Sequence, residues 1–156
     1  VAYYPDCTPL FSADPAHRAV GLAHAGWRGT AAGMAARMAE RMAQEFGTRP
    51  QELIAAVGPA IGPCCYEVDE PVARQFRGLE GVPAQAVLRE IGGGKYTVDL
   101  WEANRRLLLH AGLLPENITV ARVCTRCHFR LLWSHRATGG RRGGLAAFLR
   151  VLPEEE

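Results

Sequence analysis

A strand, a tight turn and a helix follow one another between residues 18 and 46, and this succession constrains the fold more than any other stretch. Residues 19–23 are apolar and predict a strand, and residues 24–29 have the sequence His-Ala-Gly-Trp-Arg-Gly. Methionines at positions 34, 38 and 42 then recur at helical spacing, and Gly47 follows as a stop signal. We therefore expect a strand that leads through a turn into a helix of residues 30–46, with its methionine stripe in the core.

The turn itself carries three side chains with useful chemistry. His24 can bind a metal ion or exchange a proton. Trp27 offers a flat aromatic face, and the guanidinium of Arg28 can bind an anion through two hydrogen bonds. The two glycines, Gly26 and Gly29, allow a tight turn and close approach of a ligand. A structural interpretation is equally open: His24 could bond to backbone, Trp27 could fill the core, and Arg28 could pair with a carboxylate.

A hairpin is predicted just before this turn. Residues 10–12 and 18–23 are strand candidates on either side of a polar turn, whereas Pro5 and Pro9 should interrupt regular pairing upstream. Such a hairpin places Cys7 and His24 near the same end of a sheet. A thiol beside an imidazole is either a nucleophile with its base or two ligands of a zinc site, or the two residues are unrelated neighbours.

The remaining pattern predicts one α+β domain. A Gly/Pro-rich loop with two cysteines and a tyrosine follows a buried strand at residues 58–68, which is a typical place for a site. Residues 78–94 are irregular, with one weak element near 85–91. Further strands are expected at 53–57, 96–98, 118–123, 129–133 and 145–152, and further helices at 69–76 and 100–111.

Composition excludes several classes of protein. The chain has 156 residues, of which 48% are hydrophobic and 22% charged, as in a globular domain with a substantial core. No apolar run approaches the ~20 residues of a membrane span, and no signal segment is visible, so we expect a soluble, cytoplasmic protein without a membrane partner. A net charge of +2 gives no electrostatic argument for nucleic acid.

The five cysteines indicate free thiols, metal ligands or a nucleophile rather than a disulfide framework. Residues 124–128 match the C-x-x-C-H pattern of covalent haem attachment, but the pattern lies between two predicted strands and lacks an export signal. Structural zinc with Cys64 and Cys65 is another interpretation, although two adjacent cysteines lack the spacing of a zinc knuckle. Plain loop residues are the favoured interpretation.

The last polar loop contains Ser134, His135 and Arg136, followed by Arg141 and Arg142 between glycines. Arginines on a flexible backbone can bind phosphate through two parallel hydrogen bonds. The sequence lacks a Walker pattern, which argues against a nucleoside triphosphate site. Solvated surface arginines are the slightly favoured interpretation.

Taken together, these motifs resemble one family in order and spacing over residues 1–152: the YfiH-like laccase-domain (polyphenol oxidase) family of purine nucleoside phosphorylases. The pair formed by Asp6-Cys7 and His24-Ala25-Gly26-Trp27-Arg28-Gly29 is the most specific part. The other matching segments are Thr8-Pro9, Thr30, Gly58-Pro59-Ala60-Ile61-Gly62, Tyr66-Glu67-Val68, Asp99-Leu100 with Asn104, Cys124-Thr125, and Ser134-His135-Arg136 with Gly140-Arg141.

The resemblance implies an α+β fold of two mixed β-sheets packed together and flanked by helices, distantly like the cytotoxic necrotizing factor deamidases. It also implies a single domain over residues 1–156 that lacks an N-terminal segment. By position, the family's metal-binding cysteine falls on Cys7 and one metal-binding histidine on His24; a third ligand, a histidine, is expected upstream of Val1. Ala137 stands where members commonly carry a second arginine, which weakens an anion-binding role for that loop.

The activity implied is zinc-dependent phosphorolysis of adenosine- or inosine-type nucleosides, with adenosine deaminase and methylthioadenosine phosphorylase activities also ascribed to members. The expected partners are a purine nucleoside and phosphate, the expected cofactor is zinc or copper, and Cys7, His24 and Arg28 are the expected catalytic residues. Alternatives are a copper-dependent polyphenol oxidase, a metal-free Cys/His hydrolase, and a catalytically incomplete nucleoside-binding protein.

Overall fold

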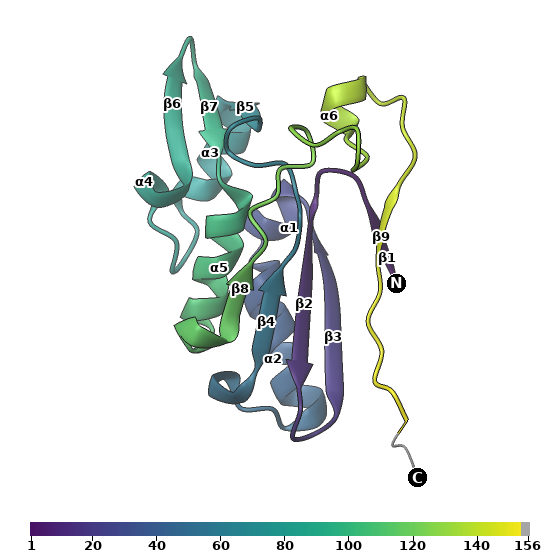
Figure 1. The fold of residues 1–156 in the computed structure, drawn as a ribbon. Helices are drawn as coiled ribbons and strands as arrows, with labels where there is room; N and C mark the ends of the chain where they lie inside the picture. The colour runs from purple at the N-terminus through teal and green to yellow at the C-terminus, as the bar shows by residue number, and fades with distance from the viewer. Residues whose placement is uncertain (154–156) are drawn as a thin grey trace.

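The structure is a computed structural model that describes residues 1–153, and it confirms the α+β class (Figure 1). Within this range, no helix combines the length and the apolar character that crossing a membrane requires. The strands are β1 (Ala2–Tyr4), β2 (Thr8–Asp14), β3 (Ala19–Ala25), β4 (Ile54–Val57), β5 (Glu67–Asp69), β6 (Leu88–Gly92), β7 (Lys95–Val98), β8 (Ile118–Val120) and β9 (Leu145–Ala147). The helices are α1 (Trp27–Ala31), α2 (Met34–Phe46), α3 (Glu70–Arg77), α4 (Ala84–Val87), α5 (Leu100–His110) and α6 (His135–Thr138), with short 3-10 helices η1 (Pro50–Glu52) and η2 (Pro115–Asn117).

The described strands form three sheets. The central sheet has the order β3-β2-β4-β8 and is mixed, since β2 runs antiparallel to both neighbours while β4 and β8 run parallel. The other two sheets, β5-β7-β6 and β1-β9, are antiparallel. Helices α2 and α5 lie together against one face of the central sheet (Figure 1).

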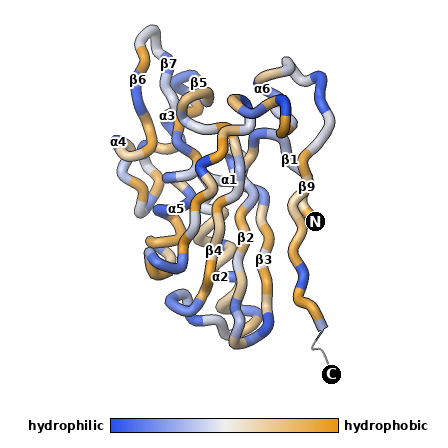
Figure 2. Tube along the Cα trace, in the orientation of Figure 1, coloured by the Kyte–Doolittle hydropathy of each residue, from blue (hydrophilic) through white to orange (hydrophobic). Residues whose placement is uncertain are grey.

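The core lies between this sheet and these helices. Met38 and Met42 of α2 are buried, which confirms the expected methionine stripe, and Leu107 and Leu108 of α5 are buried beside them. Figure 2 shows hydrophobic residues along the strands of the central sheet and also along the chain near β9. In the latter segment Phe148 and Leu152 are exposed, so hydrophobicity alone does not mark the core there.

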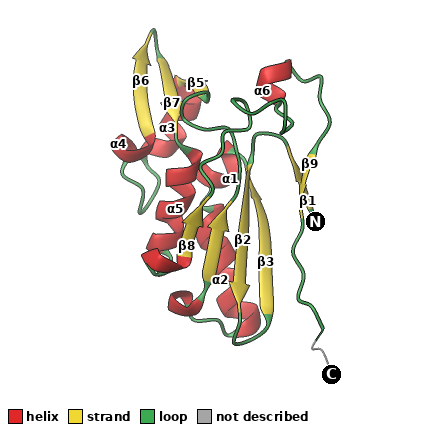
Figure 3. Cartoon of the chain, viewed as in Figure 1, coloured by secondary structure: helices red, strands yellow, loops and turns green. Residues whose placement is uncertain are grey.

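One end of the central sheet collects four chain segments. Leu10 of β2 pairs with Ala23 of β3 and with Val57 of β4, and Val57 also pairs with Val120 of β8. The start of β2 and the ends of β3, β4 and β8 are therefore neighbours. The segment that precedes β2 and the loops that follow β3, β4 and β8 gather at this end, together with α6 (Figure 3).

The predicted hairpin is confirmed, but Pro9 does not interrupt it. Pro9 lies inside β2 and pairs with His24 of β3. On its other side β4 has already ended, and the Pro9 carbonyl instead accepts a hydrogen bond from Gly58 N–H at 2.9 Å. A proline is tolerated at such a position because no neighbouring strand needs its missing N–H.

The predicted helix of residues 30–46 is two helices. It begins earlier, at Trp27, and is broken after Ala31, where Gly33 adopts a left-handed conformation with φ of 76°. Gly47, with φ of 71°, ends α2 as expected. The break leaves α1 as a separate short helix that carries Trp27 and Arg28 at the end of β3.

Three predicted strands are wrong in whole or in part. Of residues 118–123, only Ile118–Val120 form a strand, which is β8. Residues 129–133 form turns rather than a strand, with Leu131 N–H donating to the His128 carbonyl at 2.9 Å. Residues 145–152 are a strand only over β9, because β1, the strand that pairs with it, has three residues. The irregular segment 78–94 contains α4 and β6, close to the weak element expected there.

A buried carboxylate closes the far end of the hairpin. Asp14 is 2% exposed and accepts hydrogen bonds from the Thr48 hydroxyl and from His17 N–H. The Thr48 hydrogen bond, opposed by burial and assisted by His17, lowers the pKa of Asp14 to about 2. An unfolded Asp titrates near ~3.9, so this carboxylate stabilises the fold above about pH 4 and loses that contribution as pH falls toward 2.

Replacing Thr48 by valine is expected to lower the free energy of unfolding by about 1–3 kcal/mol near neutral pH, because a buried carboxylate loses its strongest donor. The deficit should shrink below about pH 4, where Asp14 becomes protonated in the unfolded chain. Urea unfolding at neutral and acidic pH measures both effects. The control is Thr119→Val, at an exposed position of β8; a Thr48→Val deficit equal at both pH values contradicts the assignment.

Candidate active site

Cys7 and His24 lie close together at the end of the central sheet where the start of β2 and the ends of β3, β4 and β8 are neighbours. Cys7 precedes β2, and His24 lies near the end of β3 opposite Pro9. Both side chains point toward Gly26: a Cβ built there would lie 2.9 Å from Cys7 Sγ and 4.0 Å from His24 Nε2. The thiol is half-buried and the imidazole is exposed, so the pair opens to solvent on one side.

The glycine at position 26 is needed for space rather than for backbone freedom. Its φ of −68° is open to any residue. A side chain at this position would instead collide with the thiol of Cys7, as the 2.9 Å approach shows. The sequence feature is therefore correctly singled out, but the reason is the close approach of a thiol and not a tight turn.

A pocket of about 170 Å³ adjoins the pair. It is lined by Asp6, Cys7, Gly26, Trp27, Arg28, Ile61, Tyr66 and Leu100. These residues come from segments that precede β2 and follow β3 and β4, with Leu100 from α5. Buried Asn104 of α5 donates to the Thr30 hydroxyl at 3.0 Å, which fixes α1 and its two pocket residues against the core.

Asp6 accepts hydrogen bonds from three loops that surround the pocket. Its carboxylate accepts hydrogen bonds from the Thr125 hydroxyl at 2.6 Å and from Arg136 N–H at 2.8 Å. Its carbonyl accepts a third from Ile61 N–H at 2.9 Å. Three loops are thereby attached to the residue beside Cys7.

Burial in the pocket favours the protonated, neutral forms of Cys7 and Tyr66, although arginines lie nearby. Burial, and then the neighbouring charge of Asp6, raise the pKa of the Cys7 thiol, and Arg142 opposes them. Burial likewise raises the pKa of Tyr66 to about 12, against the opposing charges of Arg136 and Arg28. Tyr66 is therefore a hydrogen-bond donor at neutral pH.

Arg28, expected to be catalytic, lies at the pocket with its guanidinium 4.2 Å from the centroid of the Trp27 ring. The sequence favoured solvated surface positions for the later arginines, and the structure gives two of them neighbours. Arg136 lies 5.4 Å from the centroid of the Tyr66 ring and donates to the Glu67 carbonyl at 2.9 Å. The positive charge of Arg142 lowers the pKa of the Cys7 thiol, against the larger effects of burial and Asp6. Only the fold could reveal these interactions, because both arginines are far from their neighbours in sequence.

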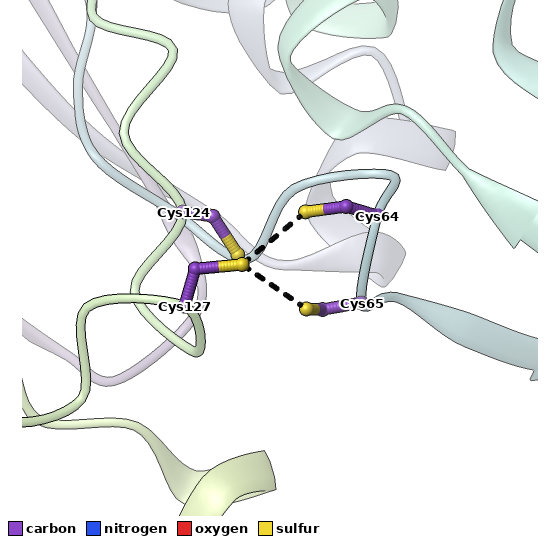
Figure 4. A group of neighbouring side chains, drawn as sticks. All are labelled: Cys64, Cys65, Cys124 and Cys127. Atoms are coloured by element: carbon purple, nitrogen blue, oxygen red, sulfur yellow. Dashed lines mark hydrogen bonds between the residues drawn. The ribbon is translucent and has the colours of Figure 1, made fainter.

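The other four cysteines form a second group, which we call the four-cysteine cluster: Cys64, Cys65, Cys124 and Cys127 (Figure 4). Their sulfur atoms all lie within 4.8 Å of one another. None of the five cysteines forms a disulfide. The sequence favoured plain loop residues here, and it could not show that two loops about 60 residues apart meet.

The sequence of this chain matches a known protein family over almost its whole length. The model of the multi-copper polyphenol oxidoreductase laccase family matches residues 1–151. The chain belongs to this family.

Named relatives of the chain are enzymes of purine nucleosides. It is 42% identical over 146 residues to purine nucleoside phosphorylase YlmD of Geobacillus stearothermophilus, which covers 94% of this chain and 53% of the relative. It is 34% identical over 134 residues to adenosine deaminase RL5 from an unknown prokaryotic organism, covering 86% of this chain and 51% of the relative. The chain thus spans about half the length of the curated relatives it matches.

A solved structure confirms the fold. The crystal structure of Bacillus licheniformis hypothetical protein YfiH is similar with a TM-score of 0.88 and 41% identity, over 91% of this chain and 53% of that one. The YfiH-like architecture expected from the sequence is therefore shown.

Gly26→Ala is expected to lower the free energy of unfolding by about 1–3 kcal/mol, because the new methyl group overpacks the Cys7 thiol. In a Cys7→Ala background the same change should cost clearly less, since the colliding sulfur is gone. Denaturant unfolding of the four proteins of this double-mutant cycle measures the coupling. Gly78→Ala, where a Cβ meets nothing within 4 Å, is the control; additive effects of Gly26→Ala and Cys7→Ala contradict the close approach.

Proposed function

We propose that this protein is a zinc-dependent purine nucleoside phosphorylase acting on adenosine- and inosine-type nucleosides. The observation that carries the proposal is the approach of Cys7 Sγ and His24 Nε2 to the same glycine, beside a pocket with aromatic and cationic walls. A thiolate and an imidazole are ligands that zinc favours. Family membership and relatives named purine nucleoside phosphorylase support the same conclusion.

The donor set fits a metal ion. Gly26 leaves open the space that a Cβ would fill between the two side chains, and the exposed side of His24 leaves room for a further ligand. Cys7 and His24 would hold the ion, with a histidine upstream of Val1 proposed as the third ligand. When bound, zinc supplies Lewis acidity for the substrate or lowers the pKa of a water ligand.

The arginines near the pocket are proposed to bind phosphate, the second substrate. Arg28 is exposed at the pocket and is held against Trp27, and Arg136 and Arg142 exert their charges on Tyr66 and Cys7. Guanidinium groups bind phosphate through paired hydrogen bonds. We assign Arg28 to phosphate and to the charge that develops during its attack.

Phosphorolysis needs only nucleoside and phosphate. A phosphate oxygen forms a bond to the anomeric carbon of the ribose while the bond to the purine nitrogen breaks. The electron pair of that bond leaves with the purine, which takes up a proton, and the products are ribose 1-phosphate and the free base. Trp27 and Tyr66 are proposed as faces for stacking the base.

The same site is proposed to deaminate adenosine, because a relative is named adenosine deaminase. Here water adds to the carbon that bears the amino group, and ammonia leaves. Methylthioadenosine, which keeps the same base, is proposed as a further phosphorolysis substrate.

Three alternatives are less well supported. A metal-free hydrolase needs a reactive thiolate at neutral pH, whereas burial and Asp6 raise the pKa of the Cys7 thiol. The copper oxidase alternative has support from the family description. Phenol oxidation that increases only with copper loading would favour it, and nucleoside binding without turnover in a calorimeter would favour a binding protein.

Cys7→Ala and His24→Ala are each expected to reduce phosphate-dependent release of purine from inosine at least about 100-fold, because each removes a metal ligand. Base release is followed with and without phosphate, alongside zinc content. His110→Ala, a half-exposed histidine beside Glu80 at the end of α5, is the matched control and should retain activity. Undiminished phosphorolysis in both site variants overturns the site assignment.

Arg28→Ala is expected to reduce kcat/KM for phosphate about 100-fold, the effect of removing a preorganised charge that stabilises a transition state. The KM for nucleoside should change much less. Steady-state kinetics with each substrate varied in turn separate the two effects. The control is Arg41→Ala on α2, which removes an exposed ion pair with Glu45; equal losses for both substrates would refute a phosphate role.

A further inference from the structure

We infer that the four-cysteine cluster is a second metal site, a tetrahedral zinc centre that joins the two loops on which the pocket depends. Cys64 and Cys65 lie in the loop after β4, and Cys124 and Cys127 in the loop after β8. The inference does not depend on the proposed activity, because none of these residues lines the pocket beside Cys7.

The positions of the sulfur atoms match such a centre. Cys127 Sγ lies 3.6 Å from Cys64 Sγ and 3.5 Å from Cys65 Sγ, as the dashed lines of Figure 4 mark. Zinc–thiolate bonds of ~2.3 Å in a tetrahedron place the sulfurs about 3.8 Å apart. The four side chains converge from two sides on one point (Figure 4). These two separations are therefore close to those of a tetrahedral zinc centre.

Adjacent cysteines are compatible with this geometry because of the local turn. Gly62 carbonyl accepts hydrogen bonds from both Cys65 N–H and Tyr66 N–H at 2.9 Å, so the chain folds tightly around it. This turn directs the Cys64 and Cys65 sulfurs toward Cys127 (Figure 4). The two-residue spacing that a zinc knuckle requires is thus present in Cys124 and Cys127 and is replaced by the turn in the other pair.

The backbone around Cys124 is arranged for a thiolate. Gly62 N–H points at Cys124 Sγ with a separation of 3.3 Å. Hydrogen bonds of this kind stabilise the ligand sulfurs of metal centres. Soft thiolates select zinc over magnesium or calcium, and binding releases the thiol protons to solvent.

The two loops already touch through backbone. Ala60 N–H donates to the Val123 carbonyl at 3.2 Å, and Thr125 N–H donates to the Ala60 carbonyl at 3.1 Å. Trp101 of α5 packs so closely on Gly62 that a Cβ there would lie 2.5 Å from its ring. These contacts bring the cysteines together before any ion is bound.

The centre would act on the pocket through immediate neighbours in sequence. Tyr66 follows Cys65 and lines the pocket, and Thr125 follows Cys124 and donates to Asp6. Bonds from one ion to all four sulfurs would hold both neighbours in place. The cysteines of the cluster are therefore positioning residues for the pocket.

The test uses the full chain purified with reductant and zinc, in the Cys7→Ser variant, so that the first site is disabled. We expect this variant to retain one zinc per chain, and zinc X-ray absorption to show only sulfur neighbours at ~2.3 Å. Cys64→Ser in the same background should lose the ion or show a mixed ligand shell. Zinc absent from the Cys7→Ser protein, iron in its place, or a disulfide joining Cys127 to Cys64 or Cys65 overturns the proposal.

A second measurement reports positioning without using activity. Hydrogen–deuterium exchange of residues 60–66 and 123–127 should rise at least tenfold in Cys64→Ser relative to the wild-type chain, and Cys7→Ser should leave these segments unchanged. Exchange that is unaffected by Cys64→Ser overturns the positioning role. Loss of nucleoside phosphorolysis alone, with zinc still bound by four sulfurs, counts against the proposed function and not against this centre.

Discussion

The buried carboxylate of Asp6 is the interaction on which the arrangement of the site depends. It receives the Thr125 hydroxyl and Arg136 N–H, while its backbone carbonyl receives Ile61 N–H. Asp6 also has a φ of 64°, a left-handed conformation that costs a non-glycine residue energy and persists only when its surroundings hold it. The three hydrogen bonds stabilise Asp6 in this conformation. They fix the direction in which the next residue, Cys7, leaves the turn.

The mixed sheet explains why these loops meet at all. An antiparallel hairpin alone would bring the start of β2 beside the end of β3, which is enough to pair Cys7 with His24. Because β4 runs antiparallel to β2 and β8 runs parallel to β4, the carboxyl ends of both strands lie at the same end of the sheet as the start of β2. The 58–66 and 121–144 loops therefore reach Asp6 although they are far apart in the chain.

Local pattern made the first half of this arrangement predictable. The hairpin, the methionine face of α2 and the approach of Cys7 to His24 all follow from spacing within the first 47 residues, where the contacts are short-range in sequence. The pairing of β4 with β8, the neighbours of Arg136 and the gathering of four cysteines depend on contacts across 60 residues or more, which periodicity does not encode. The mostly apolar residues 129–133 misled for a different reason, because they favour a strand but form turns closed by local hydrogen bonds to the His128 carbonyl.

The five thiols of the chain differ in their surroundings. Cys7 lies half-buried at the pocket beside the exposed imidazole of His24, and burial and then the charge of Asp6 raise the pKa of its thiol. The other four sulfurs lie within 4.8 Å of one another and do not line the pocket, and buried Cys124 accepts a hydrogen bond from Gly62 N–H. The open pair leaves room for a substrate beside a metal ion, whereas four sulfurs would surround an ion completely, and this is the difference between a catalytic and a structural zinc site.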